Sequence, residues 1–194
     1  MKRTFLACAG LLCGVLVGGA AGADVRVLLP LYAYPTWWDA ASYVWDDVAA
    51  AGSRAPITAI INPNNGPDGG PPNADFVIGM NALRAGGVGM IGYVHTSYGA
   101  RSAAEVKADV DLYSAYYGVG GIFLDEVSTA TNKLAYYADL YAYIKGRTNL
   151  PLVVTNPGTK TPEVYLSFPA TDTSVIFEDA EGWTTYVSDA YVAG

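Results

Sequence analysis

Apolar runs recur along the chain at a nearly constant spacing. Between them, apolar residues at helical spacing predict helices over Trp37–Ala51, Asp75–Ala85, Ala103–Tyr117 and Asn132–Arg147. Ser102 and Glu105 form the S-x-x-E pattern of a capping box at the start of the third helix. Alternating strands and helices of this length indicate βαβ units, and therefore a parallel sheet covered on both faces. The six apolar runs predict strands that begin near Val25, Ile57, Val88, Gly121, Leu152 and Ser174.

Polar or aromatic residues follow each of the six predicted strands. An open sheet gathers its site at one switch point, whereas a (β/α)₈ barrel brings every C-terminal strand end to one mouth, so this pattern favours the barrel. No G-x-G-x-x-G follows the first strand, and no P-loop is present. Six units occupy the chain to its last residue, so we expect a TIM-type barrel that is truncated after about six βα units, with the C-terminal portion missing. The residues at the strand ends are Tyr32 and Tyr34; Asn62 and Asn64; His95, Ser97 and Tyr98; Asp125 and Glu126; Thr155 and Asn156; Glu178 and Asp179.

Two of these strand ends carry clusters of carboxylates. In GIFLDEVST an apolar strand leads into Asp125 and Glu126, and in SVIFEDAEG another leads into Glu178 and Asp179. Phe123 and Asp125 share one face of their strand. Taken alone, the first pair also fits a helix N-cap before the helical stretch from Thr131. The second strand end with carboxylates favours a catalytic role for both, because glycoside hydrolysis needs two carboxyl groups that face each other across a bond.

The N-terminal segment has the layout of a secretory signal peptide. Lys2 and Arg3 precede an apolar run, and Ala21-Gly22-Ala23 resembles an A-x-A cleavage site. We therefore expect a signal peptide over residues 1–23, a mature chain that starts near Asp24, and a secreted, extracellular protein. The less favoured alternative is an uncleaved anchor. Cys8 and Cys13 both lie in this segment, so the mature chain has no cysteine and cannot form disulfides.

The charge balance narrows the class of partner. Without Lys2 and Arg3, nine basic residues face 18 acidic ones, a balance of −9. Proteins that bind nucleic acid or anionic membranes show basic clusters, and none is present, so we expect neither partner. The 15 Tyr and four Trp residues suit sugar stacking, although many of them belong to a core. Trp37 and Trp38 are expected to be core on one side of a helix.

The single histidine limits the metal chemistry available. With His95 alone and no mature cysteine, a zinc site would need an unusual set of carboxylates, so no metal and no cofactor are expected. This also disfavours a metal-dependent polysaccharide deacetylase. His95 follows a strand in YVHTSYG, where we assign it to sugar binding rather than acid/base work.

Several motifs in order resemble one known family. LLPLYAYP, INPNNGPDGG, GYVHTSYG, GIFLDEV and TNPG are similar to the spherulin-4-like proteins (spherulation-specific family 4), which include secreted hydrolases of glycoside hydrolase family 135. The likeness spans about Val25 to Gly182. It implies a (β/α)₈ fold over residues 24–194 and endo-acting cleavage of α-1,4-linked galactosaminogalactan, a partly N-acetylated, cationic exopolysaccharide. It also places the family's functional acids at Asp125, Glu126 and Glu178.

Two mechanisms fit these acids. One carboxylate attacks the anomeric carbon directly, or it orients the substrate's own acetamide as the nucleophile. We assign Asp125 to this role and Glu178 to the role of general acid/base. Glu126 is the alternative residue for either role. A non-catalytic carbohydrate-binding or spore-coat protein, and a hydrolase of another glycan, stay as alternatives. The full-length protein is expected to be a monomer with a polysaccharide partner. The predicted binding residues are Tyr32, Tyr34, Asn62, Asn64, His95, Tyr98, Asn156, Asp179 and Trp183.

Overall fold

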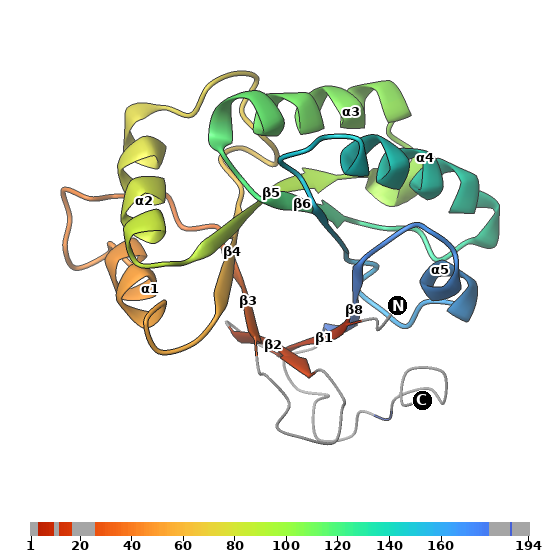
Figure 1. Cartoon of the computed structure of the whole chain (residues 1–194), viewed down its shortest axis with the longest axis horizontal. Helices are drawn as coiled ribbons and strands as arrows, with labels where there is room; N and C mark the ends of the chain where they lie inside the picture. Colours follow the sequence, from red (N-terminus) through yellow and green to blue (C-terminus); the bar gives the residue numbers. More distant parts are fainter. Residues whose placement is uncertain (1–3, 10–11, 17–25, 179–186, 188–194) are drawn as a thin grey trace.

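The chain folds into a ring of strands with helices on its outside (Figure 1). This computed structural model describes residues 4–9, 12–16, 26–178 and 187, and for residues 4–16 it describes the strands alone. The sequence also predicts a last helix that begins at Trp183, and this segment lies outside the described residues.

Six parallel strands confirm the predicted α/β barrel architecture, each paired with the next along the chain. Strands of this kind are buried on both faces, which explains why their sequences are continuous apolar runs rather than alternating ones. All six predicted strands are present. They are β3 (Arg26–Leu31), β4 (Ile57–Ile61), β5 (Gly89–His95), β6 (Gly121–Asp125), β7 (Leu152–Thr155) and β8 (Thr173–Glu178).

Two further strands complete the ring between β8 and β3. The strand β1 (Thr4–Ala9) pairs parallel with β8 and antiparallel with β2 (Leu12–Leu16), and β2 pairs antiparallel with β3. Both strands lie within the predicted signal peptide, whose removal stays a prediction.

The helices follow the predicted pattern with one clear error. The predicted helix from Trp37 begins instead at Trp45, and turns occupy residues 37–38 and 40–42. Asp39 explains the difference, because its carboxylate accepts hydrogen bonds from Ala41 N and Ser42 Oγ, which hold a turn in place of a helix. The helices are α1 (Trp45–Ala51), α2 (Ala74–Ala85), α3 (Ala103–Leu112), α4 (Leu134–Lys145) and the unpredicted α5 (Glu163–Ser167).

The start of α3 has the predicted capping box. Ser102 Oγ accepts the Glu105 backbone N–H at 3.3 Å, and Glu105 Oε2 accepts the Ser102 backbone N–H at 3.0 Å. Such caps stabilise a helix by about 1 kcal/mol.

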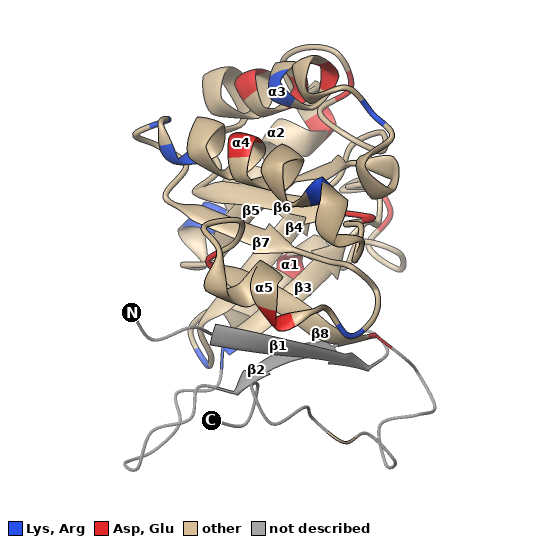
Figure 2. Ribbon diagram, turned by 90° about the vertical axis from the view of Figure 1, so that its right-hand side faces the viewer, with Lys and Arg blue, Asp and Glu red and all other residues tan. Residues whose placement is uncertain are grey.

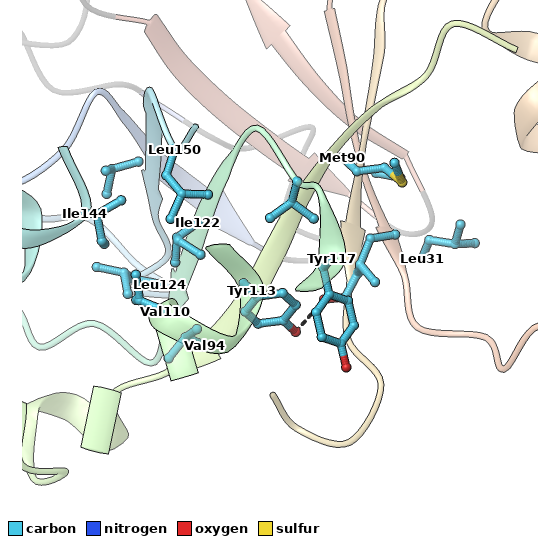
Figure 3. Packing of buried hydrophobic residues seen from close by; sticks show 14 of the residues in the cluster. Leu31, Met90, Val94, Val110, Tyr113, Tyr117, Ile122, Leu124, Ile144 and Leu150 are labelled. Carbon is cyan, nitrogen blue, oxygen red and sulfur yellow. Dashed lines mark hydrogen bonds between the residues drawn. The ribbon is translucent and has the colours of Figure 1, made fainter. Parts of the chain in front are cut away.

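The apolar residues form two layers, one inside the ring and one outside it. The inner layer consists of Leu28, Ile60, Ile91, Tyr93, Phe123, Val154 and Val175. The outer layer packs the strands against the helices, and Figure 3 shows Leu124, Ile122 and Val94 of the strands with Val110 of α3 and Ile144 of α4. Phe123 belongs to the inner layer and Leu124 to the outer one, as strand alternation requires. Asp125, two residues after Phe123, is therefore directed towards the inside of the ring.

Two tyrosines connect α3 to the loop that follows β4. The α-helix continues as one π-helical turn over Tyr113–Tyr117, and the Tyr113 hydroxyl donates to the Ile61 carbonyl at 2.9 Å (Figure 3). The Tyr117 hydroxyl donates to the Pro67 carbonyl. Gly92 allows this packing, because a Cβ at that position would lie 2.5 Å from the Tyr113 ring. Two buried hydroxyls thus anchor the Pro/Gly loop over residues 62–73, one at Pro67 and one at Ile61, the residue before the loop.

Charged residues lie on the helices and loops around the ring, and the strands carry few of them (Figure 2). Within the described part of the chain, no helix has the length and apolarity that crossing a membrane requires.

Candidate active site

Asp125 is the last residue of β6 and is held by one hydrogen bond on each carboxylate oxygen. The Tyr93 hydroxyl donates to Oδ2 at 2.7 Å, and Asn156 Nδ2 donates to Oδ1 at 2.9 Å. Tyr93 comes from β5 and Asn156 directly follows β7, so the two neighbouring strands fix the carboxylate from both sides. Donors on both oxygens leave the side chain little rotational freedom.

Asn156 also connects Asp125 to Glu178. The same Nδ2 atom donates to Glu178 Oε2 at 3.0 Å. Because one nitrogen bonds both oxygens, at 2.9 and 3.0 Å, Asp125 Oδ1 and Glu178 Oε2 lie no farther apart than 5.9 Å, the sum of the two bonds. Glycosidase carboxyls stand about 5–5.5 Å apart in retaining enzymes and about 6.5–9.5 Å apart in inverting ones. The pair therefore lies below the inverting range.

The two carboxylates differ in exposure. Asp125 is half-buried, and Glu178 is exposed at the end of β8. Gly158 lies beside Glu178, since a Cβ at that glycine would be 3.5 Å from Oε2. Asn156 is buried and its own Oδ1 accepts the Gly158 backbone N–H at 3.0 Å, which orients the amide so that Nδ2 faces the carboxylates.

Two tyrosines, Tyr32 and Tyr93, lie beside these carboxylates. Tyr32 contacts Tyr93 edge to face at 5.6 Å, and Tyr93 stacks on Phe123 of the inner layer. Burial, followed by the charges of Asp125 and Glu178, raises the pKa of Tyr32 well above its ordinary value. Burial and the hydrogen bond to Asp125 raise the pKa of Tyr93 in the same direction. Both hydroxyls thus stay protonated beside the carboxylates, and that of Tyr93 donates to Asp125.

His95 and Glu126 are the neighbours of Asp125 on the adjacent strand and along the chain. His95 is the register partner of Asp125 across β5 and β6, and its Nδ1 is 3.1 Å from Ser97 Oγ and 3.6 Å from Glu126 Oε2. Glu126, Ser97 and Tyr98 all have left-handed backbones, with φ of 51°, 48° and 54°. Such conformations cost on the order of 1–3 kcal/mol each and cluster at functional sites.

A buried hydroxyl network holds these two loops in their strained conformations. Thr96 Oγ1 donates to the carbonyls of Asp125 and Glu126 at 3.1 and 2.8 Å, so the Tyr137 hydroxyl donates to Thr96 in turn, at 3.0 Å. Tyr137 also accepts the Ser128 backbone N–H, and the Tyr98 N–H reaches the Glu126 carbonyl at 2.7 Å. The loops after β5 and β6 are therefore fixed to one another by fully buried Thr96 and Tyr137.

Other predicted binding residues make their described contacts elsewhere. Asn62 Oδ1 accepts the Gly66 N–H, and Asn64 Nδ2 donates to Asp68, so both shape their own loop. The Tyr34 hydroxyl donates to Asp75 of α2, and the exposed Tyr98 shows no described side-chain bond of this kind. Asp179 and Trp183 lie outside the described residues.

Sequence reasoning missed Tyr93 as a site residue. Its hydroxyl bonds Asp125, although the same period of two that links Phe123 to Asp125 places Tyr93 on the inward face with His95. Trp37 and Trp38 were predicted as core on one side, and this is wrong, because they are 49% and 58% exposed. The fully buried tryptophan is Trp45.

Among the described residues, no group of three or more His, Cys, Asp or Glu side chains is placed to hold a metal ion.

Comparison with known proteins agrees with this architecture. The model of spherulation-specific family 4 matches residues 26–191. The chain belongs to this family. Spherulin-4 of Physarum polycephalum is 42% identical over 168 residues, covering 86% of this chain and 48% of that protein. The resemblance predicted from the motifs is thereby confirmed.

A solved structure of similar fold carries a sugar. The crystal structure of Aspergillus clavatus Sph3 in complex with GalNAc matches with a TM-score of 0.67 and 33% identity, covering 79% of this chain and 65% of that one. The chain thus spans about half the length of the curated relative and about two thirds of the solved structure.

Proposed function

We propose that this protein is a secreted glycoside hydrolase that cleaves a hexosamine-containing polysaccharide by a two-carboxylate mechanism. The observation that carries the proposal is the Asn156 amide, which holds Asp125 Oδ1 and Glu178 Oε2 no farther than 5.9 Å apart, below the range of inverting pairs. The GalNAc in the similar structure of Sph3 supports a hexosamine ligand. The finer proposal is endo-cleavage of α-1,4-linked N-acetylgalactosamine in a galactosaminogalactan-like exopolysaccharide.

The chemistry divides between a carboxylate held on both oxygens and an exposed one for which a hydrogen bond is described on one oxygen. Asp125, restrained on both oxygens, suits the nucleophile, which must point at the anomeric carbon, or the group that orients the substrate's acetamide for its own attack. Glu178 is exposed, and we assign it to protonating the leaving oxygen and then activating water. In either route the second step regenerates the starting anomer. Glu126 is the alternative residue for either role in this scheme, and His95 binds sugar hydroxyls.

The test of this function is product analysis. The purified protein is incubated with a panel of hexosamine polymers, and mass spectrometry searches for shortened chains with new reducing ends. We expect such products from the N-acetylgalactosamine polymer. Polymer binding without any product would support the non-catalytic carbohydrate-binding alternative, and products from a different polymer would keep the reaction and change the substrate.

Removing the Tyr93 hydroxyl should slow this reaction without unfolding the protein. Tyr93→Phe deletes one donor to Asp125 and leaves the stacked ring, so kcat should fall about tenfold or more, as expected for a hydrogen bond to a charged group, while KM changes little. Tyr113→Phe is the control, because its hydroxyl bonds the Ile61 carbonyl away from the carboxylates. Equal losses in both variants, or none in Tyr93→Phe, would contradict the role of this donor.

Secretion predicts where the mature chain begins. N-terminal sequencing of protein recovered from culture medium should start at or near Asp24, because the A-x-A site precedes it. Recovery of a membrane-bound chain that keeps Met1 would support the uncleaved anchor instead.

A further inference from the structure

Three aromatic side chains between β3 and α1 expose much of their surface. Tyr34, Trp37 and Trp38, here named the aromatic platform, are 45%, 49% and 58% exposed. They contact one another, with ring centroids 5.6 Å apart for Trp37 and Trp38 and 6.3 Å apart for Tyr34 and Trp38. Side chains of this size normally belong to cores or interfaces, so a cluster left open to water indicates a binding surface.

The aromatic platform is held rigid by its polar tips. Asp75 of α2 accepts the Tyr34 hydroxyl on Oδ2 at 2.7 Å and the Trp37 indole N–H on Oδ1 at 2.8 Å. Asn73 Nδ2 donates to the Tyr34 hydroxyl at 3.2 Å, and the Tyr34 ring packs edge to face on Phe76. These contacts hold Tyr34 and Trp37 in place, so much of the cost of ordering the side chains is met before a ligand arrives.

The surroundings of the aromatic platform are acidic. Between residues 27 and 83 the sequence contains five Asp and one basic residue, Arg54. Arg54 follows the C-terminal end of α1, which in a βα unit lies at the opposite end of the barrel from the loop after β3. The hydrogen bonds from Tyr34 and Trp37 lower the pKa of Asp75, which keeps its carboxylate ionised. The hydrogen bond to Asp75 is the main cause that raises the pKa of Tyr34, and the charge of Asp68 adds a smaller contribution.

We infer that the aromatic platform is a second saccharide-binding site. It binds a stretch of hexosamine polysaccharide that bears free amino groups and extends beyond Asp125 and Glu178. The ligand class rests on the proposed function. Sugar faces stack on the exposed rings, and protonated amines lie near the Asp68 and Asp75 carboxylates. Tyr32 lies beside these two carboxylates and precedes Tyr34 by two residues, so the two Cα atoms are separated by about 7 Å of extended chain at most. One polysaccharide strand thus runs from the carboxylates across Tyr32 to the aromatic platform.

The test measures binding, so that it does not depend on hydrolysis. In an Asp125→Asn background, isothermal titration calorimetry compares a galactosamine decasaccharide with the disaccharide. Trp38→Ala should lower the ratio of decasaccharide to disaccharide affinity about tenfold, equivalent to about 1.4 kcal/mol. Tyr116→Ala is the matched control, because Tyr116 is also half exposed, at 52%, but lies in the turn after α3. The fully N-acetylated decasaccharide should bind more weakly than the amine form, and added salt should shrink that difference.

The outcomes separate the two proposals. An unchanged ratio in Trp38→Ala, or an equal fall in Tyr116→Ala, would overturn the aromatic platform as a binding site. Equal affinity for the amine and acetylated decasaccharides would overturn the preference for cationic sugar. If the wild-type protein hydrolyses none of the polymers while Trp38→Ala still lowers the ratio, the hydrolase proposal fails and the second site stands.

Discussion

Replacing Asp125 with Asn should lower kcat/KM for the polysaccharide by about 10⁴-fold, the scale seen when a central catalytic group is removed. The amide has the size of the carboxylate: its oxygen can still accept the hydrogen bond from Asn156, and its NH₂ group can donate to the Tyr93 hydroxyl oxygen, so the fold should survive. It can neither attack the anomeric carbon nor balance the charge of an acetamide intermediate. Reducing-end release by the two proteins gives the ratio directly.

Replacing Glu178 with Gln distinguishes the role of Glu178 from that of Asp125. Glu178→Gln should lose a similar factor on the polysaccharide, yet recover much of it on an aryl glycoside whose leaving group needs no proton. Asp125→Asn should show no such recovery. Asp139→Asn, which removes a surface carboxylate paired with Lys107, is the control and should keep full activity. Recovery in Asp125→Asn instead of Glu178→Gln would reverse the assignment.

Replacing Trp45 with Ala should have the largest effect on stability. Trp45 is fully buried, donates its indole N–H to the Ala33 carbonyl at 3.0 Å and packs edge to face on Phe76. Its ring also lies against Gly79, where a Cβ would be 2.5 Å away, so this neighbour has no side chain to fill the space. The free energy of unfolding should fall by about 3–5 kcal/mol, measured by denaturant unfolding.

Trp38→Ala provides the matched control for this loss. It is the same substitution seven positions earlier, on a ring that is 58% exposed, and should change the free energy of unfolding by less than about 0.5 kcal/mol. Equal losses at Trp38 and Trp45 would contradict the placement of the two rings.

The strand pattern could be predicted because it depends on local chemistry. Ile122, Phe123 and Leu124 are buried on both faces of the ring, so an uninterrupted apolar run indicates the strand, and alternation then directs Asp125 inward. The capping box of Ser102 and Glu105 was predicted for the same reason, since its two bonds lie within four residues.

The contacts that complete the candidate site were beyond such reasoning. Asn156 reaches Asp125 and Glu178 across 31 and 22 residues, and no local pattern tells which amide lies between two carboxylates. The loop before Trp45 shows the same limit. The stretch that begins at Trp37 has apolar residues at helical spacing, but Asp39 forms a local turn, and Asp75, 38 residues beyond Trp37, holds that ring at the surface.

The stereochemistry of hydrolysis tests the central claim most directly. The claim is that Asp125 and Glu178, held on one Asn156 amide, work as a retaining pair. Proton NMR of an α-1,4-linked N-acetylgalactosamine oligosaccharide, followed from the first minutes of reaction with the wild-type protein, reports which anomer forms before mutarotation. We predict that the α-anomer appears first, by direct attack of Asp125 on the anomeric carbon, and that Asp125→Asn yields no product. First release of the β-anomer would contradict the account, because inversion needs a carboxyl separation that the shared amide does not allow.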